Sequence, residues 1–388
     1  TVDRPREQRR DPLEVDLSGA GGHVAVIGGP RSGKSTLLRT LTASLALRMS
    51  PREAQFYVLD FGGGTFAPWT DLPHISGVAT RSEPEVVRRI VAEVQGVVAG
   101  REEFFRRHGI DSIETYRQRR ADGEVDDGYG DLFVVIDGWG TLRAEFDTLE
   151  GELQNLAQRG LTFGMHLIVS APRWNDFRPA IRDLLGTRLE LRLGDPSDSE
   201  IDRKTAVLVP SGRPGRGITP AKLHFLGALP RLDDNPDANR LGAGVDDLIR
   251  RIADGWEGPS GPKLKLLPSR VSLDEILKAA DPGPEDKRVF LAINERALAP
   301  VGFDLDAEPH LYAYGDAGSG KSTLLRGLAG EVAVAPSPAA EWLGPTAGRR
   351  VLLVADEPVL SGTVHEHLRV ADPDVTDAAV EEALAGVG

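Results

Sequence analysis

Short apolar runs alternate with stretches of helical periodicity over the first half of the chain. Four buried strands are predicted, at 23–27, 56–60, 132–137 and 165–170. Apolar residues with helical spacing fill 83–107, and residues 188–193 alternate apolar and polar positions as a later or edge strand does. Because strands that alternate with helices form parallel sheets covered on both faces, the pattern predicts an α/β fold.

The strand predicted at 23–27 leads into a phosphate-binding loop of the form G-x-x-x-x-G-K-[ST] at 28–35, and a helical pattern follows it. In such a loop backbone N–H groups surround phosphate oxygens, and the helix N-terminus adds positive potential. Lys34 is expected to reach the β- and γ-phosphates, and Ser35 to ligate Mg²⁺. The residues expected to bind ATP here are Gly28, Pro30, Arg31, Ser32, Gly33, Lys34, Ser35 and Thr36.

The same motif occurs a second time at 315–322, again followed by a leucine-rich stretch. The repeat predicts two tandem P-loop domains of the RecA-like α/β class, the second of them truncated. The predicted boundaries are 1–255 for the first domain, 256–287 for a linker and 288–388 for the partial second domain. Its expected nucleotide contacts are Gly315, Gly318, Ser319, Gly320, Lys321, Ser322 and Thr323, with Ser322 as a Mg²⁺ ligand. We expect weak nucleotide binding and no turnover there.

The run at 132–137 ends in Asp137, as the second element of a P-loop site does. A carboxylate at the carboxyl end of that strand lies beside the Mg²⁺ shell, so Asp137 is a candidate catalytic and metal-binding residue. Hydrolytic relatives commonly place a glutamate next, but this chain has Gly138, which cannot act as a base. The first site is therefore expected to bind ATP and to hydrolyse it slowly, with Glu145 and Asp147 as weak candidates for a substitute base.

Composition narrows the class of protein. The formal net charge is -13, which argues against a surface that grips nucleic acid throughout. The absence of cysteine excludes disulfides and thiolate metal sites. No apolar run is long enough to span a membrane. The start, TVDRPREQRRDP, resembles neither a signal peptide nor an initiator methionine, so we interpret the chain as a fragment. An acidic loop at 122–130 and a patch of arginines at 117–120 are each expected to be solvated.

An ordered series of longer stretches resembles the FtsK/SpoIIIE-type ATPases, and more closely the EccC family of type VII (ESX) secretion systems. The stretches include VLDFGGGTF (58–66), FVVIDGWGTLR (133–143), RGLTFGMHLIVSAPRW (159–174), GTRLELRLGDPSDSEIDR (186–203) and VPSGRPGRGIT (209–219). The resemblance covers residues from about 12 to 325, roughly four fifths of the chain. It implies the second of three ATPase domains, followed by the start of the third.

The resemblance also implies partners and a location. It implies ATP-dependent export of small WxG-type proteins, ring or tandem assembly with other ATPase domains, and a cytoplasmic position beneath a membrane complex, with the membrane anchor in segments that precede this region. DNA-pumping relatives commonly have a sensor glutamine where this chain has 171–173. Arg188 matches the place of a trans-acting arginine finger. A surface salt bridge is the alternative for Arg188, and Arg173 and Arg203 are weaker candidates for the finger.

After about residue 330 the sequence resembles a fragment of an ABC exporter nucleotide-binding domain instead. In that reading Asp356 takes the place of the Q-loop glutamine; in the other, 351–357 is a second Walker B strand. Three functions stay open at this point: a type VII secretion ATPase, a DNA translocase of the FtsK type, and a docking module stabilised by bound nucleotide without turnover.

Overall fold

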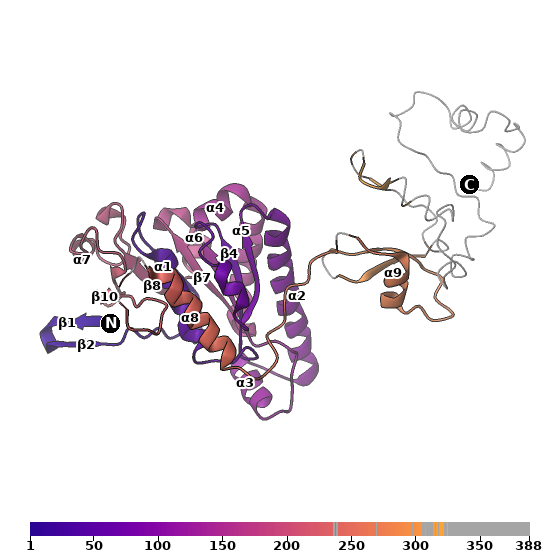
Figure 1. Ribbon diagram of the computed structural model, residues 1–388, viewed down its shortest axis with the longest axis horizontal. Coiled ribbons are helices and arrows are strands. Elements are labelled where there is room, and N and C mark those ends of the chain that lie inside the picture. The colour runs from indigo at the N-terminus through magenta and orange to yellow at the C-terminus, as the bar shows by residue number, and fades with distance from the viewer. Residues whose placement is uncertain are drawn as a thin grey trace, which may run out of the picture. The chain divides into compact units, whose positions relative to one another are not determined.

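A computed structural model describes residues 1–324 except 236, 238, 239, 269, 296, 297, 305, 306, 308–312, 315, 317, 322 and 323. The described residues form two compact units (Figure 1). The first comprises Thr1–Leu266, and the second includes Leu267–Asn294. The ABC-like tail lies outside the described residues. How the chain divides into domains stays a prediction.

A ten-stranded sheet organises the first unit, in the order β2-β1-β10-β9-β8-β3-β7-β6-β4-β5. Six strands run parallel: β3 (Val24–Ile27), β4 (Ala54–Asp60), β5 (Ile75–Thr80), β6 (Asp131–Asp137), β7 (Met165–Ala171) and β8 (Thr187–Leu191). Four antiparallel strands extend one side: β1 (Val2–Arg4), β2 (Arg9–Asp11), β9 (Arg216–Ile218) and β10 (His224–Leu226). The predicted α/β fold is confirmed.

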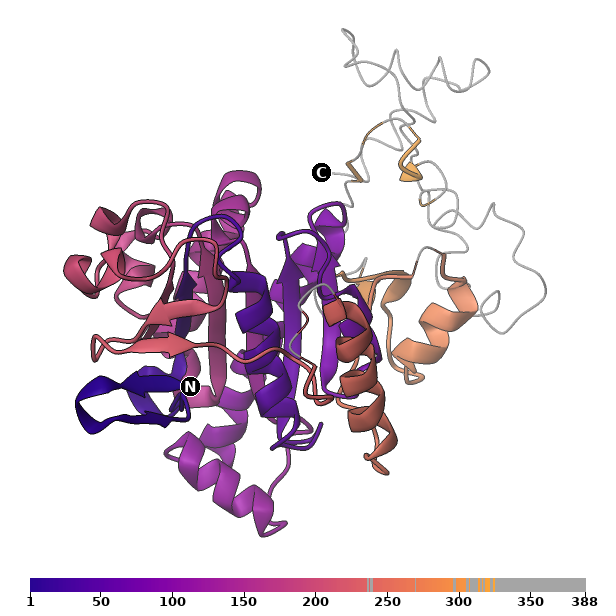
Figure 2. The same cartoon turned by 60° about the vertical axis from the view of Figure 1, so that its left-hand side comes forward.

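Helices cover both faces of this sheet (Figures 1 and 2). Val24 and Val26 pack with α1 (Lys34–Ala46) and α8 (Leu241–Asp254). Ala25 and Ile27 pack on the other face with α2 (Pro84–His108), α4 (Trp139–Glu145), α5 (Asp147–Gly160) and α6 (Pro179–Arg182). Successive side chains of a strand point to opposite faces, so one short apolar run serves two cores. Helices α3 (Ile113–Ala121) and α7 (Arg203–Val207) complete the unit.

Strand β8 covers the alternating stretch expected to be a later or edge strand. It is a later strand, but it lies inside the sheet, because β3 pairs with one side of it and β9 with the other. The three-residue strands that extend the sheet beyond β8 are too short to show a period in the sequence.

The stretch predicted as a linker begins by following the border of the first unit. Gly261 N donates to Pro73 O at 3.0 Å, and Leu264 N donates to Ser76 O at 2.8 Å. The Lys263 ammonium donates to Ile75 O at 2.8 Å. These bonds lie along β5, and they explain why the first unit extends to Leu266.

The second unit contains α9 (Leu273–Ala280) and an antiparallel pair, β11 (Val289–Ile293) and β12 (Pro300–Phe303). Ser272 caps α9: its hydroxyl accepts from Glu275 N at 3.2 Å, and the Glu275 carboxylate accepts from Ser272 N at 2.8 Å. This reciprocal pair is a capping box, which fixes the start of the helix.

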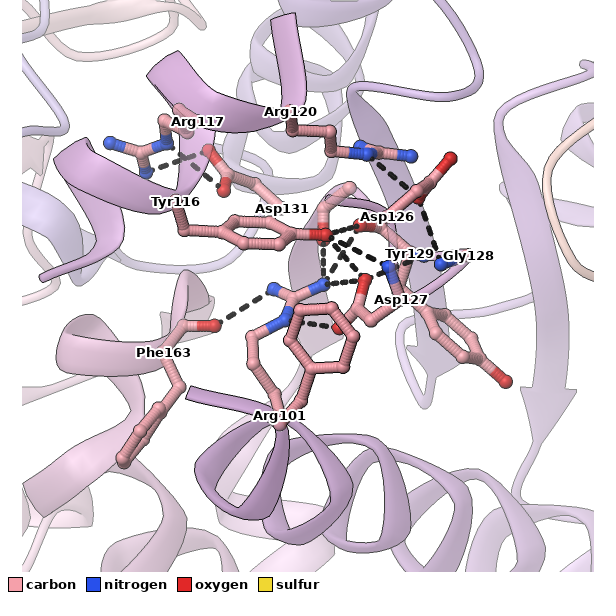
Figure 3. Close-up of polar contacts among 12 residues, drawn as sticks. Arg101, Tyr116, Arg117, Arg120, Asp126, Asp127, Gly128, Tyr129, Asp131 and Phe163 are labelled. Carbon is pink, nitrogen blue, oxygen red and sulfur yellow. Dashed lines mark hydrogen bonds and ion pairs between the residues drawn. The ribbon is translucent and has the colours of Figure 1, made fainter. Parts of the chain in front are cut away.

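The arginines and aspartates near the amino end of β6 are not simply solvated (Figure 3). Arg101 is fully buried, and its guanidinium pairs with Asp127 at 2.7 Å. It also donates to the carbonyls of Phe163, Tyr129 and Gly130. The Tyr116 ring lies 5.0 Å from the guanidinium carbon. The prediction of a solvated acidic loop is wrong at this position, because a buried cation requires a buried counter-charge.

The arginine patch is likewise engaged with carboxylates. Arg117 pairs with Asp131 at 2.8 Å, and Arg120 pairs with Asp126 at 2.9 Å. Two arginines three residues apart on α3 therefore hold the loop that leads into β6. The sequence could not show this, because the partners meet only when the loop folds back over the helix.

Candidate functional site

The first glycine-rich loop lies between β3 and α1, as predicted, and neighbouring strands hold it in place. Gly28 N donates to Ala171 O at 3.1 Å, and Gly29 N donates to Arg192 O at 2.8 Å. Gly33 has φ +103°, and a Cβ there would lie 2.8 Å from Gly215 N. Only glycine fits both the backbone angle and the space at this position.

Lys34 is the first residue of α1, and its side chain folds back over the loop. Its ammonium donates to Gly28 O at 2.8 Å and to Gly29 O at 3.0 Å. Burial lowers the pKa of Lys34, while the charges of Asp137 and Asp176 act in the opposite direction. The ammonium therefore has carbonyl partners that phosphate oxygens can replace.

The remaining residues of the first loop differ in exposure. Pro30 and Arg31 are exposed, whereas Ser32 is buried and its hydroxyl makes no hydrogen bond. Ser35 and Thr36 lie in the first turn of α1 and are partly exposed. Arg39 donates to Ser35 O at 3.3 Å and to the Thr36 hydroxyl at 3.4 Å. Phosphate binding by these residues stays a prediction.

Asp137 ends β6, and its two carboxylate oxygens have different surroundings. Oδ1 accepts from the Ser170 hydroxyl at 2.6 Å. Oδ2 is buried and accepts no hydrogen bond. An unpartnered buried carboxylate oxygen is costly in an apolar core, and oxygen is the ligand type that Mg²⁺ and its water shell prefer. The arrangement fits the predicted role of Asp137 beside a magnesium ion.

Gly138 follows with φ +101° and donates its N–H to Ser170 Oγ at 3.0 Å. A glutamate in this backbone conformation would be strained, because left-handed angles disfavour residues with a Cβ. The position thus lacks the usual base and has a backbone shaped for glycine. Of the two weak candidates for a substitute base, Glu145 pairs with Arg81 at 2.8 Å, and Asp147 is the first residue of α5.

One carboxylate that acts on Lys34 was not predicted from the sequence. Asp176 follows β7, and its charge raises the pKa of Lys34 against the effect of burial. Its Oδ2 accepts from Arg173 N at 3.0 Å. No motif of the sequence marks this position.

Arg188 lies in β8, opposite Ala25 of β3. Its guanidinium pairs with Glu200 at 3.2 Å and lies 5.0 Å from the centre of the Trp174 ring. These contacts correspond to the salt-bridge alternative. The trans-acting role stays a prediction, and it requires Arg188 to exchange these partners for a neighbour's nucleotide.

The second loop is described in part. Gly318 and Gly320 have φ +78° and +91°. The Lys321 ammonium donates to Asp316 O at 2.8 Å, and Ser319 N donates to the same carbonyl at 3.1 Å. The predicted contacts Gly315, Ser322 and Thr323 lie outside the described residues. Nucleotide binding by the second loop stays a prediction.

Two absences are established for the described residues. Within them no group of three or more histidine, aspartate or glutamate side chains is placed to hold a metal ion by itself. None of their helices has the length and apolar character needed to cross a membrane.

Comparison with known proteins decides the family. The model of the FtsK/SpoIIIE family matches residues 1–234. The chain belongs to this family. The resemblance drawn from the sequence is thereby confirmed, and the P-loop class implies nucleotide binding, usually with Mg²⁺.

Several relatives of this FtsK/SpoIIIE chain are components of ESX secretion systems. The ESX secretion system protein EccC of Thermomonospora curvata is 50% identical over 326 residues, which cover 84% of this chain and 25% of the relative. The ESX-1 protein EccCb1 of Mycobacterium tuberculosis is 41% identical over 345 residues, which cover 87% of this chain and 58% of the relative. The chain thus spans between a quarter and about three fifths of these relatives.

Solved structures agree with the FtsK/SpoIIIE fold. Thermomonospora curvata EccC (ATPases 2 and 3), in complex with a signal sequence peptide, has a TM-score of 0.79 at 49% identity and covers 85% of this chain. The match covers 60% of that chain. EssC (ATPases 2 and 3) from Geobacillus thermodenitrificans has a TM-score of 0.65 at 19% identity, with 86% of this chain and 63% of that chain covered, and this likeness shows the fold alone.

Proposed function

We propose that this chain is an ATP- and Mg²⁺-binding ATPase module of a type VII secretion machine, and that its first site binds nucleotide tightly and hydrolyses it slowly. The observation that carries the proposal is the contrast between Asp137 and Gly138. Asp137 keeps a buried oxygen without a partner. Gly138 occupies the position of the usual base in a left-handed conformation.

The chemistry assigned to each residue follows from its position. Lys34 exchanges the carbonyls of Gly28 and Gly29 for phosphate oxygens, while N–H groups of the loop and the N-terminus of α1 hold the remaining charge. Ser35 and Asp137 would hold Mg²⁺, which would neutralise charge at the phosphates. With no base after Asp137, the attacking water is poorly oriented, and the barrier to hydrolysis stays high.

We propose partners and location on the same basis. The relatives are parts of ESX systems, and one solved relative holds a signal sequence peptide. Secreted proteins of the small WxG type are the proposed substrates, and other ATPase domains of the same machine are the proposed neighbours in a ring or tandem assembly. The module would then work at the cytoplasmic face of a membrane complex.

The decisive experiment measures bound nucleotide and ATP turnover on the purified chain, beside Lys34→Ala. Lys204→Ala is the matched control, because Lys204 is an exposed lysine on α7. We expect co-purified or added ATP to be retained with turnover far below the median enzyme rate of about 10 per second. Retention should be lost in Lys34→Ala and kept in Lys204→Ala.

Three results would redirect the proposal. Rapid Lys34-dependent turnover would show that another group replaces the missing glutamate and would favour a motor. Retained nucleotide with no turnover at all would favour a docking module stabilised by nucleotide. DNA binding that weakens steeply with salt would favour a translocase, which the net charge of -13 argues against.

A further inference from the structure

A second carboxylate, Asp60, lies beside Asp137 at the edge of the sheet that carries the first site. Asp60 ends β4 and Asp137 ends β6, and the parallel register pairs the two residues directly. Each is 2% exposed. Two adjacent buried carboxylates need a compensating arrangement, because their charges repel each other and both lose hydration.

Both oxygens of Asp60 are used by the glycine-rich turn that follows it. Oδ1 accepts from Gly62 N at 3.0 Å, and Oδ2 accepts from Phe66 N at 2.8 Å. Phe66 is fully buried, so the end of the turn is also fixed by packing. With its oxygens occupied in this way, Asp60 is no substitute for the missing base at 138. Its carboxylate sets the shape of the loop 61–66.

The loop 61–66 brings Gly62 against the oxygen of Asp137 that has no partner. A Cβ on Gly62 would lie far inside van der Waals contact with Asp137 Oδ2. The backbone angle of Gly62 is not left-handed, so glycine is required here for space alone. The N–H of Gly62 is directed to Asp60, which leaves Asp137 Oδ2 without a donor from this side.

Asp137 is therefore held from two sides. The Ser170 hydroxyl fixes Oδ1 from β7, and the backbone of Gly62 borders Oδ2 from the loop after β4. The charge of Asp137 also acts on two nearby cations. Burial lowers the pKa of Lys34 and of Arg39, and the negative charge of Asp137 opposes that effect at both. Asp60 adds to the opposing effect at Arg39. The carboxylate plane is thus set before any ligand binds, which is the condition for an effective metal ligand.

We propose that Asp60 is a positioning residue of the magnesium site and that Gly62 is the contact through which it acts. The Asp60 carboxylate fixes the loop 61–66, and the loop holds Asp137 so that its Oδ2 would be available to Mg²⁺ or its water shell. This inference rests on the proposed binding of ATP with Mg²⁺. Groups that orient a metal ligand typically change metal affinity by about 10- to 100-fold when they are removed.

The test distinguishes the contribution of Mg²⁺ to nucleotide affinity from the affinity for nucleotide alone. The affinity of the full chain for a fluorescent ADP analogue is titrated in Mg²⁺ and in excess EDTA, for the wild type, Gly62→Ala and Asp60→Asn. Gly140→Ala is the control, because a Cβ on Gly140 in α4 meets nothing within 4 Å. We expect the gain in affinity from Mg²⁺ to fall at least about tenfold in both variants. The affinity in EDTA should stay within about twofold of wild type, since the loop that binds phosphate is unchanged.

The outcomes distinguish this inference from the proposed function. If wild type shows no Lys34-dependent nucleotide binding, the proposed function fails first. If wild type gains affinity from Mg²⁺ and both variants gain as much, the positioning role is overturned. An equal loss in Mg²⁺ and in EDTA would show a purely structural role and would also overturn it. Asp60→Asn keeps one acceptor oxygen, so it decides the matter if Gly62→Ala fails to fold.

Discussion

The two phosphate loops of this chain share one pattern of hydrogen bonds. In the first, Ser32 N and the Lys34 ammonium both donate to Gly29 O. In the second, Ser319 N and the Lys321 ammonium both donate to Asp316 O. The bond from Leu37 N to Gly33 O at 2.9 Å, which begins α1, also has a counterpart from Leu324 N to Gly320 O at 2.9 Å. The motif itself therefore specifies the local shape of the loop.

The two loops differ in the described residues that surround them. In the first, backbone atoms of Gly194 and Gly215 lie 2.9 Å and 2.8 Å from the Cβ positions of Gly29 and Gly33. At Gly318 and Gly320 of the second, nothing lies within 4 Å among the described residues. Arg31 in the first loop has φ +59°, where the second has Gly318. Strands and turns far along the chain thus support the first loop and constrain what it can contain.

The largest expected loss of stability comes from a substitution that disturbs the contact between the first loop and Gly215. Gly33→Ala combines left-handed strain with a collision against Gly215 N. Gly123→Ala is a matched control, because Gly123 has φ +76° but open space around its Cβ. We expect Gly33→Ala to lower the free energy of unfolding by about 3 kcal/mol or more, and Gly123→Ala by about 1 kcal/mol. Urea titration followed by tryptophan fluorescence measures both. Equal losses would show that the neighbours of the first loop contribute nothing.

A second prediction concerns the strand that leads into the first loop. His23 is buried, its Nδ1 accepts from Leu167 N at 2.9 Å, and burial lowers its pKa to about 4. A protonated His166 would also lower the pKa of His23, but burial lowers the pKa of His166 as well. Above the unfolded pKa of about 6.5, His23 is neutral in both the folded and the unfolded chain, so protonation costs no stability there. Stability is then lost as pH falls from about 6.5 toward 4, by about 3 kcal/mol for this residue.

Urea midpoints at pH 7, 5.5 and 4.5 measure this loss, and His23→Gln provides the comparison. Glutamine offers a donor and an acceptor but does not titrate in this range. The variant should be less stable at pH 7 and should show a shallower dependence on pH. Parallel slopes for the two proteins would assign the acid sensitivity to other groups. The equivalent histidine before the second loop, His310, lies outside the described residues.

The smallest effect is expected at the point where the two loops differ in sequence. Arg31→Gly gives the first loop the residue type that the second has at Gly318. Glycine adopts φ +59° without strain, whereas alanine is strained at this angle. The free energy of unfolding of Arg31→Gly should therefore be about 1 kcal/mol larger than that of Arg31→Ala. Thermal unfolding of the two variants checks the difference. A more stable Arg31→Ala would show that the angle costs nothing in this loop.

Much of the fold followed from the sequence because its signals are local. The helix predicted at 83–107 is α2 (Pro84–His108), where Pro84 occupies the first turn and Gly109 ends the helix with φ +61°. The strands that end in Asp60 and Asp137 follow from continuous apolar runs. The antiparallel extension from β9 to β2 did not follow, because its strands hold three residues each.

In the candidate site, too, some residues could be predicted from local motifs and others depend on the tertiary structure. The positions of Lys34 and Asp137 could be predicted, because each sits in a motif whose spacing carries its chemistry. The roles of Ser170 and Gly62 could not, because both depend on which strands become neighbours in the sheet. The same is true of Asp176, which a loop after β7 brings within electrostatic reach of Lys34.

By itself, the sequence determined the two phosphate loops, the alternation of strands and helices, and the absence of a glutamate after Asp137. These are properties of short segments, where glycine geometry and apolar periodicity act over a few residues. Only the tertiary structure decided that Asp60 holds the loop beside Asp137, and that Arg101 is neutralised by Asp127. Those contacts join residues on different strands and loops, and burial gives them their strength because water no longer competes for the charges.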